Sequence, residues 1–271
     1  MLLALDIGNT QTVVGLYELE PDDANVERRL ADTSLVDHWR IATNAERTSD
    51  EYALVIQEFL AFHGFSFDEH VGGLAVSSVV PRVTGAIRDM SLRYFGFAAL
   101  VVEPGVKTGL PILYDNPKEV GADRIANAVG AYDLYGGPTI IVDFGTATTF
   151  DAVSAKGEYL GGAIVPGVEI SLDALFERAA ALRRVELAEP RNVIGRSTVE
   201  SLQSGAVYGF TSQVDGMCER FRDELGPVTV VATGGLATLI APLSRSIEHH
   251  EPWLTLHGLR LIYERNRSKP G

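Results

Sequence analysis

A short turn containing an aspartate and a glycine occurs twice in this chain of 271 residues, once in each half. The first copy runs from Asp6 to Thr12 and the second from Asp143 to Thr149; both have Gly two residues after Asp and Thr six residues after it. Each copy lies between two apolar runs, which predicts a β-hairpin. Such turns offer backbone N–H groups and hydroxyls beside a carboxylate, so two facing copies predict a polyphosphate site with an aspartate on each side.

One copy alone is also what ordinary hairpin chemistry would give. The repetition at about half the chain length favours a duplicated fold. No Gly-x4-Gly-Lys-Ser/Thr run occurs in the chain, which excludes a phosphate loop of the Walker type.

The charge balance limits the classes of partner. The formal net charge is −13, and 46% of the residues are hydrophobic, as in a globular protein. Acidic residues spread along the chain argue against non-specific binding to nucleic acid or anionic membranes. We therefore expect no nucleic-acid partner and no membrane partner.

Cysteine usage and the N-terminal residues indicate the compartment. Cys218 is the only cysteine, which fits a reducing compartment, and its helical surroundings favour a buried apolar role over a nucleophilic one. The first residues lack the basic region of a signal peptide. The uncharged stretch 225–244 is broken by glycines and prolines, which argues against a membrane span. We expect a cytoplasmic protein.

The hydrophobic pattern predicts the same order of elements in both halves. We expect a helix capped by Ser49 or Asp50 and further helices over 82–95, 122–135, 170–180, 198–225 and 256–263, with His249 and His250 in a polar connector. The expected strands are 2–5, 12–17, 39–42, 74–80, 99–102, 139–142, 148–153, 159–164 and 228–232. This order predicts an α/β fold of two ribonuclease-H-like domains with an interdomain cleft, over residues 1–117 and 118–271.

Several motifs occur together in one order. They are Asp6-x-Gly8-Asn9-Thr10, Gly121-Ala122-Asp123-Arg124, the turn from Asp143 to Thr149, Gly161-Gly162 with Pro166-Gly167, and Thr233-Gly234-Gly235. The chain resembles the sugar-kinase, actin and heat-shock-chaperone ATPase superfamily, and within it type III pantothenate kinase. The resemblance extends from residue 1 to about residue 265.

The resemblance implies ATP-dependent phosphorylation of the 4′-hydroxyl of pantothenate, the first step toward coenzyme A. It also implies Mg²⁺ with ATP, a monovalent cation (K⁺ or NH₄⁺) and a homodimer. By the same resemblance Asp123 is the catalytic base and Asp143 the monovalent-cation ligand, while Asp6 holds Mg²⁺ through water. The implied nucleotide contacts are Asp6, Gly8, Asn9, Thr10, Gln11, Thr12, Thr146, Gly234 and Gly235. The implied pantothenate contacts are Tyr114, Gly121, Ala122, Asp123, Arg124 and Thr198.

Simpler interpretations remain open for individual residues. Asp123 at a helix start also makes a favourable contact with the helix dipole, and Arg124 is also explained as a solvated surface residue. Thr198 is also explained as a helix-start residue. Gly234 and Gly235 are also explained by a tight turn.

Two other functions stay open. One is a kinase for another small substrate, such as a sugar or acetate; the other is a non-catalytic nucleotide sensor, because the family includes members first described as accessory factors for transcription activation. The predicted helix 198–225 would span roughly 42 Å at 1.5 Å per residue. Its long apolar stripe, with the mixed segment 182–185 nearby, favours a homodimer surface, although the helix is also explained by spanning its own domain.

Overall fold

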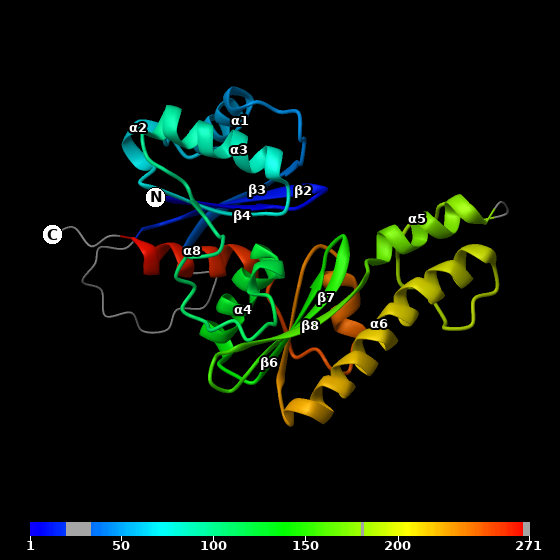
Figure 1. Cartoon of the computed structure of the whole chain (residues 1–271). Coiled ribbons are helices and arrows are strands. Elements are labelled where there is room, and N and C mark those ends of the chain that lie inside the picture. Colours follow the sequence, from blue (N-terminus) through cyan, green and yellow to red (C-terminus); the bar gives the residue numbers. More distant parts are fainter. Residues whose placement is uncertain (20–33, 180–181, 268–271) are drawn as a thin grey trace. The chain divides into compact units, whose positions relative to one another are not determined.

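The chain forms two compact units, which the computed structural model describes over residues 1–19, 34–179 and 182–267. The first unit is Met1–Leu134 with Trp253–Gly271, and the second is Tyr135–Pro252 (Figure 1). Each unit is built on one five-stranded sheet.

The first sheet has the strand order β3-β2-β1-β4-β5. Its first three strands pair antiparallel, and β4 and β5 extend it in parallel from β1. The side chains of β1 are almost all buried, because helices cover both faces of this sheet. The strands are β1 (Leu2–Ile7), β2 (Gln11–Tyr17), β3 (Leu35–Ala42), β4 (Gly73–Ser78) and β5 (Leu100–Val101).

The helices of the first unit lie on the two faces of this sheet (Figure 1). Residues of α1 and α3 pack with one face of β1, β2 and β4 around Leu5, Val14 and Val76. The last helix, α8, packs on β1, β2 and β4 from the other face. The helices are α1 (Ser49–Ala61), α2 (Phe67–His70), α3 (Pro81–Met90) with a π-helical turn (Ser91–Phe95), a 3₁₀ turn (Pro117–Glu119), α4 (Ala122–Tyr135) and α8 (Leu254–Asn266).

The contact between α4 and α8 is close. A Cβ on Gly258 would collide with Ala126, and Thr255 donates to Asn127 at 2.7 Å. His257, which is 1% exposed, bonds Asp133 at 3.0 Å and holds the pKa of that carboxyl below its ordinary value. These bonds fix the helix that carries Asp123 to the helix that covers the sheet.

The second sheet repeats the plan of the first. Its order is β10-β9-β6-β7-β8, so each sheet has three antiparallel strands followed by two parallel ones. The predicted duplication of one α/β plan is therefore confirmed. The strands are β6 (Thr139–Phe144), β7 (Ala147–Val153), β8 (Tyr159–Pro166), β9 (Thr229–Thr233) and β10 (His249–His250).

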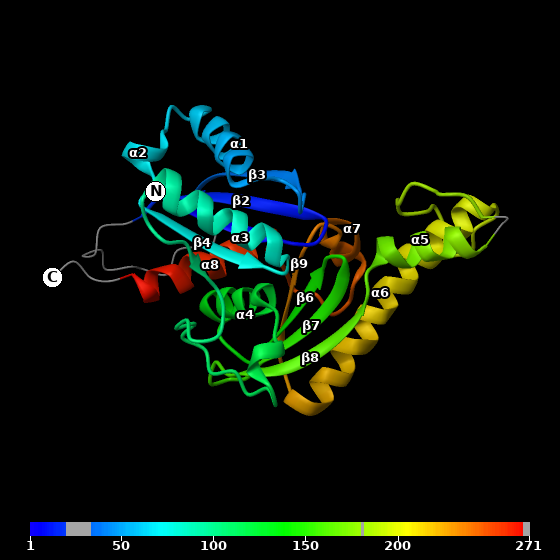
Figure 2. The ribbon, with the colours of Figure 1, turned by 45° about the horizontal axis from the view of Figure 1, so that its top comes forward.

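The long helix α6 dominates the second unit. Its C-terminal part packs on the sheet through Val214 and Cys218, against Val142 and Phe150. Its N-terminal part runs beside α5, as Figures 1 and 2 both show. The helices are α5 (Val168–Arg178), α6 (Thr198–Leu225), α7 (Ala237–Ile240) and a 3₁₀ turn (Ala241–Leu243).

Two local expectations were wrong. Thr48, rather than Ser49 or Asp50, caps α1: its side chain accepts from Glu51 N, and the Glu51 side chain bonds back to Thr48 N. His249 and His250 form the short strand β10 rather than a connector. Two exposed residues that pair in parallel with Val231 and Ala232 carry no hydrophobic pattern that would reveal a strand.

In the structure α8 and nearly all of α4 belong to the first unit, whereas the predicted boundary between residues 117 and 118 placed both helices in the second domain. The stretch 225–244 divides into the end of α6, strand β9 and helix α7. Within the described ranges, no helix is both long and apolar enough to cross a membrane.

Candidate active site

The first acidic turn joins β1 to β2. Asp6, the second-last residue of β1, is half-buried and pairs with Val13 of β2 and Ser77 of β4. Gly8 N donates to Gln11 O at 3.0 Å and closes the turn, and a Cβ on Gly8 would lie only 3.1 Å from that oxygen. Ligands bind at the carboxyl ends of parallel strands in open α/β sheets, and Asp6 lies at such an end.

The tip of this turn is exposed and its base is fixed. Asn9, Thr10 and Gln11 are exposed. Thr12 is fully buried, and its hydroxyl lies 2.9 Å from that of Thr43. Thr43 N also donates to Thr10 O at 2.9 Å. Thr43 therefore holds both Thr10 and Thr12, and the structure gives the Thr12 hydroxyl a role in fixing the turn. Its direct contact with a nucleotide stays a prediction.

The second acidic turn joins β6 to β7. Asp143 is half-buried and pairs with Thr149 of β7 and Thr233 of β9. Gly145 N donates to Ala147 O at 3.1 Å and closes a turn that is one residue shorter than the first. Asp143 therefore lies at the end of its central strand, as Asp6 does, beside a parallel neighbour.

Two further glycines contact the second turn. Gly234 has φ +92°, and a Cβ there would lie 2.5 Å from Asp143 Oδ1 and 2.6 Å from Phe144 N. Gly167 N donates to Thr146 O at 3.1 Å, and a Cβ on Gly167 would collide with that oxygen. The structure thus brings Asp143, Thr146 and Gly234 together, and the close approach explains why glycine is needed.

The motif Gly121–Arg124 forms the start of α4. Asp123 Oδ1 accepts from Arg124 N at 2.8 Å, and a Cβ on Gly121 would collide with the Asp123 carboxylate. Ala122 is the first residue of the helix. Arg124 is 7% exposed, so the alternative of a solvated surface arginine is wrong.

The other two predicted pantothenate contacts lie in different units. Tyr114 is half-buried in the segment before α4. Thr198 is the exposed first residue of α6, and the preceding Ser197 is the cap, because its side chain accepts from Glu200 N. Thr198 is therefore not the capping residue, and helix capping does not explain its hydroxyl.

The predicted site residues divide between the two units. The first unit holds the residues of the first turn, Asp6 to Thr12, with Tyr114 and Gly121 to Arg124. The second unit holds Asp143, Thr146, Thr198, Gly234 and Gly235. Each unit thus carries one acidic turn.

The residues at Asp6 fit a magnesium ion that arrives with a nucleotide. The described part of the chain has no group of three or more His, Cys, Asp or Glu side chains that could hold a metal by themselves. Mg²⁺ keeps several waters and takes one or two carboxylates together with substrate phosphates, so a single aspartate suits it. Ser77, which pairs with Asp6, is fully buried, and its hydroxyl has no hydrogen-bond partner within the described residues.

Sequence reasoning missed two buried polar residues, Ser77 and Asp151. Asp151 is fully buried in the second sheet and accepts from Tyr159 at 2.7 Å and from Thr149 at 3.1 Å. A serine at the end of the apolar run of β4 was the available signal for Ser77.

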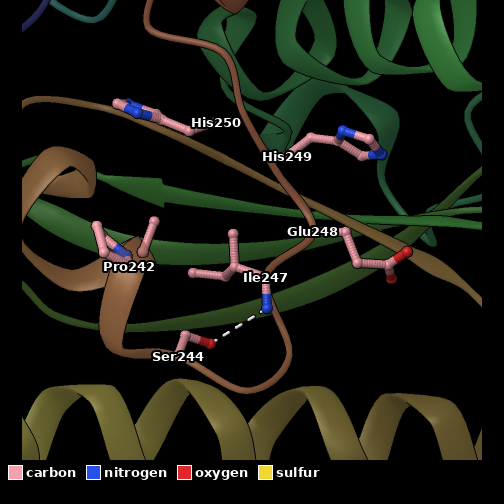
Figure 3. Close-up of a pocket in the computed structure, with 7 residues that line it drawn as sticks. Pro242, Ser244, Ile247, Glu248, His249 and His250 are labelled. Atoms are coloured by element: carbon pink, nitrogen blue, oxygen red, sulfur yellow. Dashed lines mark hydrogen bonds between the residues drawn. The ribbon is translucent and has the colours of Figure 1, made fainter.

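The segment 241–250 of the second unit lines a surface hollow (Figure 3). Ser244 accepts from Ile247 N at its base, and His249 and His250 point to opposite sides of β10 (Figure 3). It contains none of the predicted site residues.

Cys218 has the inert role that the sequence predicts. The side chain is fully buried in the core between α6 and the second sheet. Burial raises the pKa of its thiol to about 12, so a thiolate does not form near neutral pH.

Comparisons with known proteins agree on one family. The family model described as type III pantothenate kinase matches residues 2–220. A type III pantothenate kinase from Streptomyces griseus is 54% identical, with 99% of this chain and 100% of the relative covered. One from Myxococcus xanthus is 53% identical with the same coverage.

Solved structures support the fold. A protein from Campylobacter jejuni described as a Baf family transcriptional activator is similar with a TM-score of 0.58 and 18% identity, covering 97% of this chain and 98% of that one. The ethanolamine utilization protein EutJ from Carboxydothermus hydrogenoformans is similar with a TM-score of 0.53 and 13% identity, covering 96% and 89%. At these identities the likeness concerns the fold alone.

Proposed function

The chain belongs to the type III pantothenate kinase family, and on that premise we propose that it transfers the γ-phosphoryl group of ATP to the 4′-hydroxyl of pantothenate. This is the first step of coenzyme A biosynthesis. The observation that carries the proposal is the similarity over the whole chain to named pantothenate kinases, with Asp6, Asp123 and Asp143 all present.

The first turn serves the nucleotide. Phosphoryl transfer has a loose transition state, so the protein contributes mainly positioning and neutralisation of charge. The exposed tip, with Gly8, Asn9 and Thr10, offers donors to the phosphates, and Gln11 and Thr12 continue the same site. Asp6 holds the hydrated Mg²⁺, which supplies charge neutralisation at the phosphates.

Asp123 accepts the proton of the attacking hydroxyl. Its Oδ1 accepts from Arg124 N at 2.8 Å, and we assign the contact with the substrate hydroxyl to the other oxygen, Oδ2. A carboxylate held near the hydroxyl can act as its general base. Gly121 and Ala122 let the substrate approach this helix end.

Arg124 and two hydroxyl-bearing residues bind pantothenate. The guanidinium of Arg124 can bind the substrate carboxylate through two parallel hydrogen bonds, and its burial makes the charge effective. Tyr114 and Thr198 supply further polar contacts. These residue roles rest on the family resemblance and on the local geometry of each unit.

The second turn serves a monovalent cation and the nucleoside. The Asp143 carboxylate lies close to Gly234 and would supply an oxygen ligand to K⁺ or NH₄⁺. Thr146 contacts the nucleotide, and the absence of side chains at Gly234 and Gly235 lets the backbone approach the adenine or ribose.

The protein acts in the cytoplasm as a homodimer, without a nucleic-acid partner. The middle and C-terminal parts of α6 pack on its own sheet through Phe210, Met217 and Phe221. The region around its N-terminus does not: Ile194 is 83% exposed, Val193 65% and Val199 49%. Exposed apolar side chains gathered at one end of a helix fit an isologous contact with a second copy. Light scattering at micromolar concentration tests this, and a fully active species of 29.3 kDa would contradict it.

One assay tests the reaction itself. ADP release, coupled to a spectrophotometric readout, is measured with and without pantothenate, and with sugars or acetate in its place. We expect release that depends on pantothenate. Release only with another acceptor would identify a different small-molecule kinase, and nucleotide binding without any release would identify a non-catalytic sensor.

A further inference from the structure

Ser77 has an unusual position for a buried serine. It is the second-last residue of β4 and pairs in register with Asp6, the second-last residue of β1. Register partners in adjacent strands project to the same face of a sheet, so the hydroxyl and the carboxylate are neighbours on one face. Ser77 is fully buried, and its Oγ has no hydrogen-bond partner in the parts of the chain that the structure describes.

A buried hydroxyl without a partner is destabilising. Burial removes such a group from water without a replacement hydrogen bond, and each example in a native structure calls for an explanation. Another buried serine of the same unit shows the ordinary solution: Ser91 is also fully buried, and its Oγ donates to Phe97 O at 2.7 Å. Within the described residues, the hydroxyl of Ser77 therefore makes no hydrogen bond that would stabilise the fold.

The neighbouring acid suggests what the hydroxyl is for. A carboxylate only accepts hydrogen bonds, and a serine hydroxyl is a donor that can rotate toward it. Catalytic hydrogen bonds are often long in a protein without its ligands and tighten in the complex. One donor at one oxygen of Asp6 would turn the other oxygen toward the water shell of the magnesium ion.

We propose that Ser77 is a positioning residue for Asp6: in the complex with Mg²⁺ and nucleotide its hydroxyl donates to the Asp6 carboxylate and fixes the orientation in which that group holds the hydrated metal. The proposal rests on the proposed function of the Asp6 turn. It assigns to β4, which lies outside the predicted motifs, a part in the nucleotide site.

The first test is the stability of the protein without ligands. Ser77→Ala removes an unsatisfied hydroxyl, so the thermal midpoint should rise by about 2–4 °C. The matched variant Ser91→Ala removes a satisfied hydroxyl and should lower the midpoint. A fall for Ser77→Ala equal to that for Ser91→Ala would show that the Ser77 hydroxyl is bonded within the fold, and would overturn the proposal.

The second test is metal-dependent nucleotide binding, measured by calorimetry with ADP at several Mg²⁺ concentrations. The Mg²⁺ concentration needed for half-saturation should rise about three- to tenfold in Ser77→Ala and stay unchanged in Ser91→Ala. In the kinase assay the same shift should appear in the Mg²⁺ requirement, with the KM for pantothenate unchanged. An unchanged Mg²⁺ requirement in Ser77→Ala would overturn the proposal.

These readouts separate the two claims. If the wild-type protein releases no ADP in response to pantothenate, the proposed function fails, while stability and Mg²⁺-dependent ADP binding still decide the role of Ser77. If the wild type is an active pantothenate kinase and Ser77→Ala matches it in Mg²⁺ requirement, only the role of Ser77 fails.

Discussion

The two acidic turns share a sequence pattern but not a register. Three residues separate β1 from β2, whereas two separate β6 from β7. Thr12 consequently pairs with Ile7, while Thr149, at the same distance from its aspartate in sequence, pairs with Asp143 itself. Because side chains alternate along a strand, a shift of one residue moves the threonine to the other face of the sheet.

The two turns are also supported differently. Hydrogen bonds from the segment after β3, at Thr43, brace the first turn and leave its tip exposed. The second turn is enclosed by the backbone of Gly167 and Gly234. On the proposed function, the open first turn serves the phosphates and the enclosed carboxylate of the second turn serves a cation, so that the two copies of one turn have different tasks.

The largest expected effect comes from the acid that belongs to neither turn. If the turns hold nucleotide and cation while Asp123 takes the proton, Asp123→Asn should lower turnover by about 10²–10⁴-fold and leave ADP binding intact. The exposed helical aspartate Asp89 offers a matched control, Asp89→Asn, with turnover near that of the wild type. Turnover of Asp123→Asn within about threefold of wild type would remove Asp123 from the mechanism.

The next effect sharpens the claim that the second turn is enclosed. Gly234→Ala places a side chain at positive φ against Asp143, so the thermal midpoint should fall by about 4 °C or more. Gly235→Ala meets no atom within 4 Å and should shift the midpoint by less than about 1 °C. Equal midpoints for the two variants would show that the second turn accommodates a side chain at residue 234 without cost, and is therefore not enclosed.

The smallest effect tests the difference in register. Thr149→Val deprives the buried carboxylate of Asp151 of a donor and should lower the midpoint by about 2–4 °C. Thr12→Val removes the hydrogen bond between the hydroxyls of Thr12 and Thr43. The Thr43 hydroxyl is half-buried and can bond to water instead, so the thermal midpoint should fall less than in Thr149→Val. The reverse order of the two midpoints would contradict the register comparison.

Features that depend on local pattern were predictable from the sequence. The bounds of α4 and α6 agree with the prediction, and an apolar periodicity marks α6 over its whole length. The burial of Cys218 followed from the same periodicity. The order of elements predicted the α/β plan of each unit, apart from the short strand β10.

Features that depend on pairing between distant segments were not predictable. The register of the two hairpins is set by turn length, which the shared Asp–Gly–Thr spacing conceals. The neighbour of Asp6 on β4, Ser77, is 71 residues away in sequence, and only the parallel pairing of β1 with β4 reveals it. Likewise, nothing in the Gly121–Arg124 motif itself shows that Arg124 is buried.

The division of labour between the turns is tested most directly by the rate of pantothenate-dependent ADP release in potassium and in sodium at equal ionic strength. The rate of the wild type should be much higher in potassium than in sodium. Asp143→Ala should lose that difference, because the carboxylate of the second turn is the proposed cation ligand, while Ser91→Ala should keep it. Equal wild-type rates in potassium, sodium and a bulky organic cation would contradict the account.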